Sequence, residues 1–416
     1  EMCIRDRLIN MALYELEQAN GFVTEGYEIN KAIDFESNIL GEANTRSSKL
    51  RGLLQLFQEV RLTDAIGQLI DVGDLYNQLL YIFAEEAGKK INNVLAPTEV
   101  VSLITKLIDG NRKNACLCDP ASGSGTLLIE VGKKMGIRGT DIYGQEVNWN
   151  LYALTKMNLM LNGFKGATFL WGDSLRSPKL LDHGGLKKFD IVVSVPPFAD
   201  KWASEEAYDD FYRRFKYGIP PKSQVTWAYI SHILASLRND GQAVVVVPVG
   251  VLFRNTESKI REQIIEYNLL EAVIELPSNL FHGTAISTAI LVFRKERMRT
   301  QTLFVDARKG YISNKGLYKL SDKVLEQLPN IYKKFLIGEE VGGEKNGCPV
   351  YVATQDEIRH NKYDLKVIKY VEDKIERKEI DVKDALRKID ELEERLTYID
   401  KQFKDCAWRL RELTKE

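Results

Sequence analysis

Seven short apolar runs follow one another between residues 115 and 293, and most are separated by segments with helical periodicity. A short apolar run bounded by turn residues is typical of a strand buried on both faces. Strands that alternate with helices predict parallel βα units. The runs are 115–118, 141–144, 167–170, 189–195, 242–248, 270–276 and 289–293. We therefore expect a doubly wound α/β domain whose ligands bind at the carboxyl ends of the strands.

A glycine-containing turn, DPASGSGTLLIE at residues 119–130, follows the first run and opens a helix. Gly123 and Gly125 allow a sharp turn and a close approach of a ligand to the backbone. The start of the helix offers free N–H groups and the positive end of the helix dipole. The spacing differs from the G-x-G-x-x-G fingerprint, which argues against an NAD site.

Acidic residues end the next two runs. Glu146, in DIYGQEVNWN, lies where a carboxylate can bind both ribose hydroxyls of a nucleoside. Asp173, in WGDSL, follows the third run and could accept the exocyclic amine of an adenine. Either residue alone could instead cap a helix. Together with Asp119 they form a series, each after a strand, and this series favours a nucleoside-binding edge.

The fourth run ends abruptly in DIVVSVPPFADKW, residues 190–202. Pro196 and Pro197 carry no N–H group for a strand ladder, so the strand must stop there. Phe198 is therefore predicted to lie beyond the carboxyl end of the strand, with Val195 directly before the two prolines.

Helical patterns flank the predicted sheet on both sides. The C-terminal pattern predicts a long amphipathic helix with a coiled-coil seam. It either folds back on its own domain or docks on a partner or another long helix, and we favour docking. The expected divisions are an N-terminal helical domain (1–90), the sheet domain (91–310), a linker or accessory segment (311–365) and the C-terminal helix (366–416).

The charge of the chain is nearly balanced, with 58 Lys and Arg against 59 Asp and Glu. A protein that grips DNA alone usually carries a basic excess. Either DNA is not a ligand, or a partner supplies much of the contact.

No apolar run approaches the roughly 20 residues of a membrane span, and no signal peptide is recognisable. Five scattered cysteines fit the reducing cytoplasm, and Cys116 and Cys118 are expected in the core rather than on a metal.

Several motifs resemble the modification (M) subunit of type I restriction–modification systems, a family of S-adenosylmethionine-dependent DNA adenine-N6 methyltransferases. They are DPASGSG, GQEVNWNLYALTKMNLMLNG, GDSL, VPPF, RFKYGIPPKS, WAYISHIL and NLLEAVIELPSNLFHGTAISTAILVF. The resemblance extends from about residue 35 to residue 310, and the run 214–223 is typical of this family in particular. It implies a Rossmann-like class I methyltransferase domain. The implied partners are DNA, a specificity (S) subunit, a restriction (R) subunit and a second M subunit, in the cytoplasm and without a membrane.

The resemblance also implies which residues hold S-adenosylmethionine. Glu146 would hold the ribose and Asp173 would contact the cofactor adenine. The segment VLAP, which ends at Pro97, would pack against the methionine end through residues that include Leu95. The residues that would line the methionine and ribose side are Asp119, Ala121, Ser122, Gly123 and Gly125.

The catalytic motif departs from the family pattern at one position. The family has Asn-Pro-Pro-Phe or Asn-Pro-Pro-Tyr, in which the Asn oxygen and the first proline carbonyl accept the hydrogens of the target amine. The aromatic residue stacks on the adenine after it is flipped out of the duplex. This chain has Pro196, Pro197 and Phe198, with Val195 in place of Asn. Loss of such an acceptor typically costs about 2–4 kcal/mol, roughly 10²–10³ in rate. Ser194 should point to the opposite face of the strand and cannot replace it.

A second departure lies at VLAP, where the family has Phe-Tyr-Thr-Pro.

From these motifs together we expect an adenine-N6 DNA methyltransferase subunit. The alternative is a catalytically impaired scaffold of the same fold that binds cofactor or DNA. A methyltransferase for RNA or protein is disfavoured, because RFKYGIPPKS points to the DNA-modifying family.

Overall fold

The computed structural model of the chain describes residues 2–19, 34–37, 41–59, 72–87, 96–110, 112, 114–198, 200–281, 284–314, 317–341, 348–371 and 382–413. The chain divides into two compact units, Glu1–Val371 and Glu372–Glu416. Among the helices of the described residues, none combines the length and apolar composition needed to cross a bilayer.

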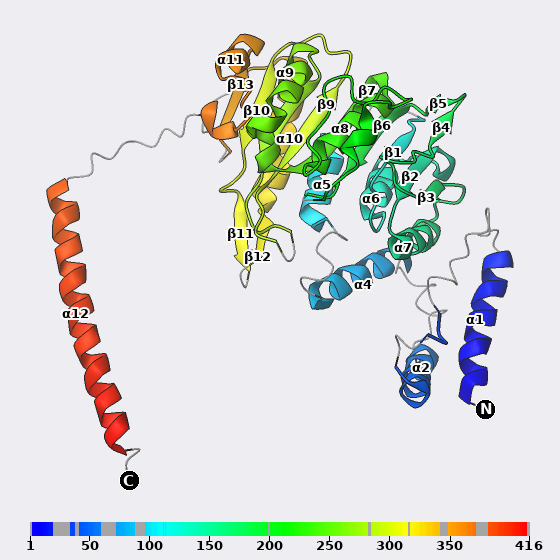
Figure 1. Ribbon diagram of the computed structural model, residues 1–416, viewed down its shortest axis with the longest axis horizontal. Helices are drawn as coiled ribbons and strands as arrows, with labels where there is room; N and C mark the ends of the chain where they lie inside the picture. Colours follow the sequence, from blue (N-terminus) through cyan, green and yellow to red (C-terminus); the bar gives the residue numbers. More distant parts are fainter. Residues whose placement is uncertain are drawn as a thin grey trace. The chain divides into compact units, whose positions relative to one another are not determined.

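One nine-stranded sheet organises the first unit (Figure 1), in the order β13-β10-β8-β9-β7-β6-β1-β2-β3. All seven apolar runs contribute a strand, and the predicted α/β fold is confirmed. The strands are β1 (Leu117–Asp119), β2 (Ile142–Glu146), β3 (Thr168–Trp171), β6 (Phe189–Ser194), β7 (Leu237–Pro248), β8 (Leu270–Glu275), β9 (Thr288–Arg294), β10 (Thr302–Asp306) and β13 (Val350–Ala353).

The sheet is mixed rather than wholly parallel, which corrects the expectation from the sequence. β9 runs antiparallel to both β7 and β8, and β13 runs antiparallel to β10. The other neighbouring pairs are parallel. A parallel neighbour normally requires a helical crossover. No helix is present in the described residues between β8 and β9, so the chain returns along β8 in the opposite direction.

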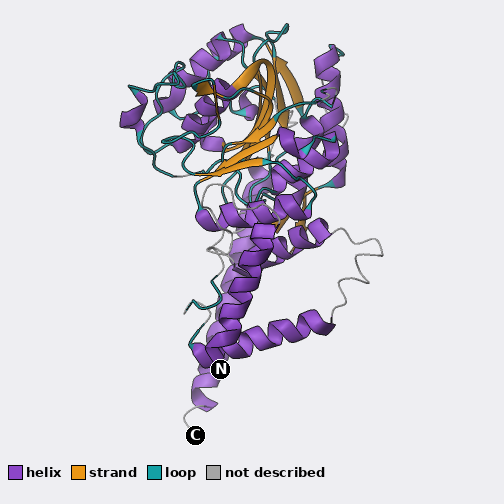
Figure 2. Cartoon of the chain, turned by 90° about the vertical axis from the view of Figure 1, so that its right-hand side faces the viewer, coloured by secondary structure: helices purple, strands orange, loops and turns teal. Residues whose placement is uncertain are grey.

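Helices cover both faces of the sheet, as Figure 2 shows for the strands drawn in orange. The alternation along β6 explains why: Ile191 and Val193 belong to one apolar cluster, and Val192 belongs to the other. The first cluster includes residues of α5 (Thr98–Leu107), α6 (Thr126–Met135), α7 (Trp149–Leu161) and α10 (Asp322–Ile337). The second includes residues of α8 (Val225–Ser236), α9 (Ser258–Glu266) and α11 (Gln355–His360).

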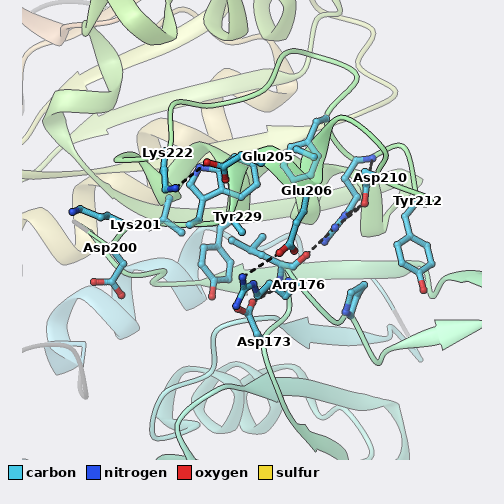
Figure 3. A pocket seen from close by; sticks show the side chains of 18 of the residues that line it. Asp173, Arg176, Asp200, Lys201, Glu205, Glu206, Asp210, Tyr212, Lys222 and Tyr229 are labelled. Carbon is cyan, nitrogen blue, oxygen red and sulfur yellow. Dashed lines mark hydrogen bonds and ion pairs between the residues drawn. The ribbon is translucent and has the colours of Figure 1, made fainter.

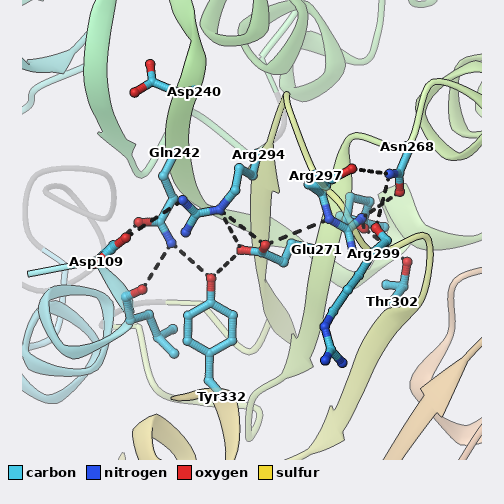
Figure 4. Close-up of polar contacts among 12 residues, drawn as sticks. Asp109, Asp240, Gln242, Asn268, Glu271, Arg294, Arg297, Arg299, Thr302 and Tyr332 are labelled. Carbon is cyan, nitrogen blue, oxygen red and sulfur yellow. Dashed lines mark hydrogen bonds and ion pairs between the residues drawn. The ribbon is translucent and has the colours of Figure 1, made fainter. Parts of the chain in front are cut away.

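A buried polar network joins α10 to the sheet (Figure 4). Tyr332 donates its hydroxyl hydrogen to Glu271 of β8, and Gln242 of β7 donates to the Tyr332 oxygen at 3.0 Å. Arg294 of β9 pairs with Glu271 at 3.2 Å. Gln242 also donates to the carbonyl of Leu107 at 3.1 Å, which ties α5 to the same network. Buried polar groups that satisfy one another in this way fix the register of the elements that carry them.

The segment 311–365, expected as a linker or accessory segment, contributes β13 to the main sheet and α10 and α11 to its two faces. It also contains the hairpin of β11 (Tyr311–Asn314) and β12 (Leu317–Leu320). The smaller hairpin of β4 (Leu181–Asp182) and β5 (Gly185–Leu186) precedes β6.

The predicted terminal helices are present. The first unit begins with α1 (Met2–Ala19), α2 (Ala43–Glu59) and α4 (Val72–Ala87). The second unit contains α12 (Val382–Leu413), one continuous helix of 32 residues. Apolar side chains of α12 at the predicted seam positions are exposed, among them Leu392, Leu396 and Phe403.

Candidate active site

The turn after β1 depends on two glycines in the left-handed region, Gly123 with φ +54° and Gly125 with φ +74°. A Cβ at Gly125 would also collide with the side chain of Thr155 on α7. The hydroxyl of Thr155 donates to the carbonyl of Gly123 at 2.6 Å. The turn is therefore fastened to α7 and leads directly into α6.

Glu146 ends β2 beside this turn, as predicted. Its two carboxylate oxygens accept from the backbone N–H groups of Gly123 and Asn148, each at 2.8 Å. Burial raises the pKa of Glu146, and these backbone donors oppose the increase. Each oxygen retains a lone pair, so the carboxylate can still accept from ligand hydroxyls.

Asp119 ends β1 and is 2% exposed. Its Oδ1 accepts from the Ala121 backbone at 2.9 Å and from the Ser194 hydroxyl at 2.8 Å. Burial raises its pKa from the ordinary 3.8 to about 7, and both hydrogen bonds oppose the increase. Because Asp119 holds the hydroxyl of Ser194, and Ser194 does not line the cavity described next, this serine does not replace the missing asparagine.

The cavity at the carboxyl edge of β1, β2 and β6 has a volume of about 240 Å³. Its walls bring together residues predicted to hold the cofactor and the residues that follow β6. From the sequence predictions, these lining residues are Asp119, Ala121, Ser122, Gly123, Glu146, Val195, Pro196, Pro197 and Phe198. Gly125 lies in the same turn but is not among the lining residues.

Phe281 was not anticipated from the sequence, yet it lines the same cavity. Its ring meets that of Phe198 edge-on, with centroids 5.4 Å apart. A signal was available, because Phe281 follows the end of β8 as Phe198 follows the end of β6. Two aromatic side chains therefore flank the position beyond β6 where a planar base could stack.

Asp173 lies in a second, larger cavity of about 640 Å³ (Figure 3). Its Oδ1 accepts from the backbone of Leu175 at 2.8 Å and of Arg176 at 3.2 Å, so it closes a turn after β3 rather than capping a helix. The two cavities adjoin, since the residues that line both are Val147, Pro197, Asp200 and Tyr229. The structure thus places Asp173 in the cavity next to Glu146 rather than in the same one.

Leu95 and Pro97 of the VLAP segment were both expected near the methionine end of the cofactor. Leu95 lies outside the described residues. Pro97 is buried and directly precedes α5, and it is Ala96 that lines the smaller cavity. The Tyr81 hydroxyl of α4 donates to the Ala96 carbonyl at 3.2 Å. Helix α4 thus contacts the wall of the cavity.

Arg214, in RFKYGIPPKS, anchors the loop that carries Asp173. Its guanidinium donates to the carbonyls of Ser174 at 3.1 Å and Leu175 at 2.8 Å. It also pairs with Asp210 at 2.7 Å, and both side chains are 6% exposed. This role depends on contacts between distant segments, so the motif alone did not predict it.

The arrangement fits a nucleoside cofactor. A fixed carboxylate beside a glycine turn can take ribose hydroxyls, and Asp173 lies one cavity farther, where an adenine amine could be accepted. In the described ranges, no three histidine, cysteine, aspartate or glutamate side chains gather as metal ligands would.

Comparisons with known proteins agree with this geometry. The family model described as N-6 DNA Methylase matches residues 69–379. The type I restriction enzyme MpnII methylase subunit of Mycoplasma pneumoniae is 31% identical over 389 residues, which cover 89% of this chain and 68% of that protein. The MjaVIII methylase subunit of Methanocaldococcus jannaschii is 32% identical over 360 residues, covering 82% and 59%. The chain thus spans about two thirds or less of these relatives' length.

A solved structure is similar as well. The crystal structure of the type I restriction–modification system methyltransferase subunit from Streptococcus thermophilus superposes with a TM-score of 0.72 at 27% identity. The match covers 83% of this chain and 72% of that one.

Proposed function

This chain belongs to the N-6 DNA methylase family, as its motifs predicted, and from this premise we propose that it transfers a methyl group from S-adenosylmethionine to the exocyclic amine of adenine in DNA. It would do so as the modification subunit of a type I restriction–modification system. The sulfonium of the cofactor supplies an activated methyl group. The residues of the chain bind it, orient the adenine and accept the hydrogens of the amine.

One observation carries the proposal: the residues that follow β6 share a single cavity with the carboxylates of Asp119 and Glu146. Glu146 would hold the ribose, and Asp173 in the adjoining cavity would accept from the cofactor adenine. Phe198 would stack on the flipped target base, and the Pro196 carbonyl would accept one hydrogen of its amine. The residues proposed for the methionine and ribose side remain Asp119, Ala121, Ser122, Gly123 and Gly125, with Leu95 and Pro97 near the methionine end.

The partners we propose are DNA, a specificity subunit, a restriction subunit and a second M subunit, in the cytoplasm where the DNA is held. The near-neutral charge of the chain supports a specificity subunit that brings much of the DNA contact. The exposed apolar side chains of α12 support a helical docking partner, because exposed seam positions of this kind normally pack against a second helix.

Val195 supports a second candidate function, a scaffold of the same fold that binds cofactor or DNA without transferring methyl groups. Valine offers no acceptor where the family has asparagine. The scaffold would still bind S-adenosylmethionine, because the residues proposed to hold the cofactor, Glu146 among them, do not depend on the side chain of Val195.

Methyl transfer by Val195→Asn compared with the wild-type chain separates the two functions. Each is co-expressed with the specificity subunit and given labelled S-adenosylmethionine and unmethylated DNA. If methyl transfer depends on the asparagine side chain of the family motif, Val195→Asn should be about 10²–10³ faster than the wild type. Wild-type transfer near the rate of Val195→Asn would exclude the scaffold. Val195→Ala is the matched control, because it changes the space without adding an acceptor. Calorimetry with S-adenosylhomocysteine tests cofactor binding, and no binding would contradict the methyltransferase and the cofactor-binding form of the scaffold.

A further inference from the structure

The reaction proposed above needs a hydrogen-bond acceptor on the target amine that Val195 cannot supply. We propose that Asp200 is the catalytic residue that supplies it. This inference rests on the proposed function and concerns the same cavity. Asp200 lies two positions beyond Phe198, in the segment that follows the two prolines.

The other polar side chains of the smaller cavity are already engaged. Asp119 and Glu146 each accept two hydrogen bonds from the chain and lie on the cofactor side. The serine and threonine hydroxyls bond to the loops around them, and Asn148 caps α7. Among the described residues that line this cavity, Asp200 and Tyr229 alone carry polar side-chain groups that form no hydrogen bond or ion pair within the chain.

Asp200 and Tyr229 also lie at the right place, since both line the smaller cavity together with Phe198 and Phe281, at its border with the larger one. Figure 3 shows the Asp200 carboxylate and the Tyr229 hydroxyl turned toward the same side of the larger cavity. Burial raises the pKa of Tyr229, and nearby carboxylates that include Asp200 raise it further, so its hydroxyl stays a donor. A tyrosine hydroxyl is neutral and also donates, whereas a carboxylate is negatively charged and only accepts, so Asp200 is the stronger acceptor for an amine that becomes positively charged.

A carboxylate at this position completes the chemistry. As the target nitrogen begins to bond to the methyl carbon, the bond from that carbon to sulfur breaks, and its electron pair stays on sulfur. The nitrogen acquires the positive charge and must lose one proton. Asp200 accepts a hydrogen bond from this N–H group in the transition state, as the asparagine oxygen does in the family motif, and its charge stabilises the developing positive charge. Because Asp200 is exposed, the proton can leave to water.

Substitutions at Asp200 and Val195 test whether the Asp200 carboxylate takes the role of the asparagine amide of the family motif. Tritiated methyl transfer to unmethylated plasmid DNA is measured for the complex with the specificity subunit. Asp200→Ala should lower the rate about 100-fold. Asp200→Asn retains an acceptor oxygen and should stay within about tenfold of the wild type. In a Val195→Asn background, Asp200→Ala should cost less than about tenfold, because the amide makes the carboxylate dispensable. Asp182→Ala, in the β4–β5 hairpin outside both cavities, is the control with unchanged rate.

A binding measurement adds a readout besides activity. Sequencing of the modified plasmid locates the methylated adenine, and duplexes are made with adenine or purine at that position. Purine lacks the exocyclic amine. The preference for adenine over purine should fall about fivefold in Asp200→Ala relative to the wild type, the worth of about one hydrogen bond.

Three results would overturn the assignment. The first is a wild-type rate in Asp200→Ala. The second is a loss as large in the Val195→Asn background as in the wild type. The third is methyl transfer by Val195→Asn with none by the wild type, in which case Asp200 does not replace the amide and the chain is the scaffold considered above. If every variant binds S-adenosylhomocysteine and none transfers a methyl group, the proposed function itself fails.

Discussion

Replacing Asp119 by asparagine should make the chain more stable at neutral pH than at acidic pH, relative to the wild type. In the folded chain this carboxyl is 2% exposed, and its pKa is raised from 3.8 to about 7, mainly by burial. Between these values the unfolded chain has lost the proton and the folded chain retains it. Folding stability therefore falls as the pH rises through this window. Asparagine carries no such proton and removes that dependence.

The magnitude follows from the width of the window. The interval from 3.8 to about 7 spans roughly three pH units, each worth about 1.4 kcal/mol, so the upper limit is about 4 kcal/mol. Between pH 5 and pH 7 the free energy of unfolding of Asp119→Asn should rise by about 2 kcal/mol relative to the wild type. Any constant cost of the unpaired amide N–H groups does not change this slope. Other buried carboxyls, such as Glu257, titrate in both proteins and cancel in the difference.

Urea unfolding of both proteins at pH 5, 6, 7 and 8, followed by near-ultraviolet circular dichroism, measures the difference. It should increase up to pH 7 and level off above it. A flat difference for Asp119→Asn would refute the reasoning, because it would mean that Asp119 ionises in the fold as it does in water.

Three further substitutions test individual contacts. Gly125→Ala should abolish binding of S-adenosylhomocysteine in calorimetry, because φ is +74° there and the new Cβ would collide with Thr155. Tyr332→Phe should lower the free energy of unfolding in urea by about 1–3 kcal/mol, because it removes one donor from the buried carboxylate of Glu271 and the acceptor that Gln242 uses. Arg214→Met should weaken binding of S-adenosylhomocysteine about tenfold by releasing the loop after β3, and Arg214→Lys should restore only part, since lysine lacks the planar fork. Unchanged affinity or stability would contradict the contact assigned to that residue.

The parts of the site predicted from the sequence are those encoded within single loops. The glycine turn, Glu146 and Phe198 each follow a strand directly, and carboxyl ends of parallel strands meet at one edge. The structure brings Glu146 and Phe198 to one cavity with the turn. Residues such as Phe281 and Arg214 were missed, because their roles depend on partners far away in the chain.

The sequence by itself determined seven of the nine strands of the main sheet, the α/β class and the family, because periodicity and short motifs are local properties. Only the tertiary structure decided that β9 runs antiparallel, that β13 joins the sheet edge, and that Asp173 lies in a cavity adjoining that of Glu146. An apolar run reads the same in either direction, and strand pairing is set by hydrogen bonds between segments distant in the chain. For the same reason the significance of Val195 changed. The sequence shows a missing acceptor, whereas the fold shows which neighbouring carboxylate, Asp200, lines the same cavity and is free to act.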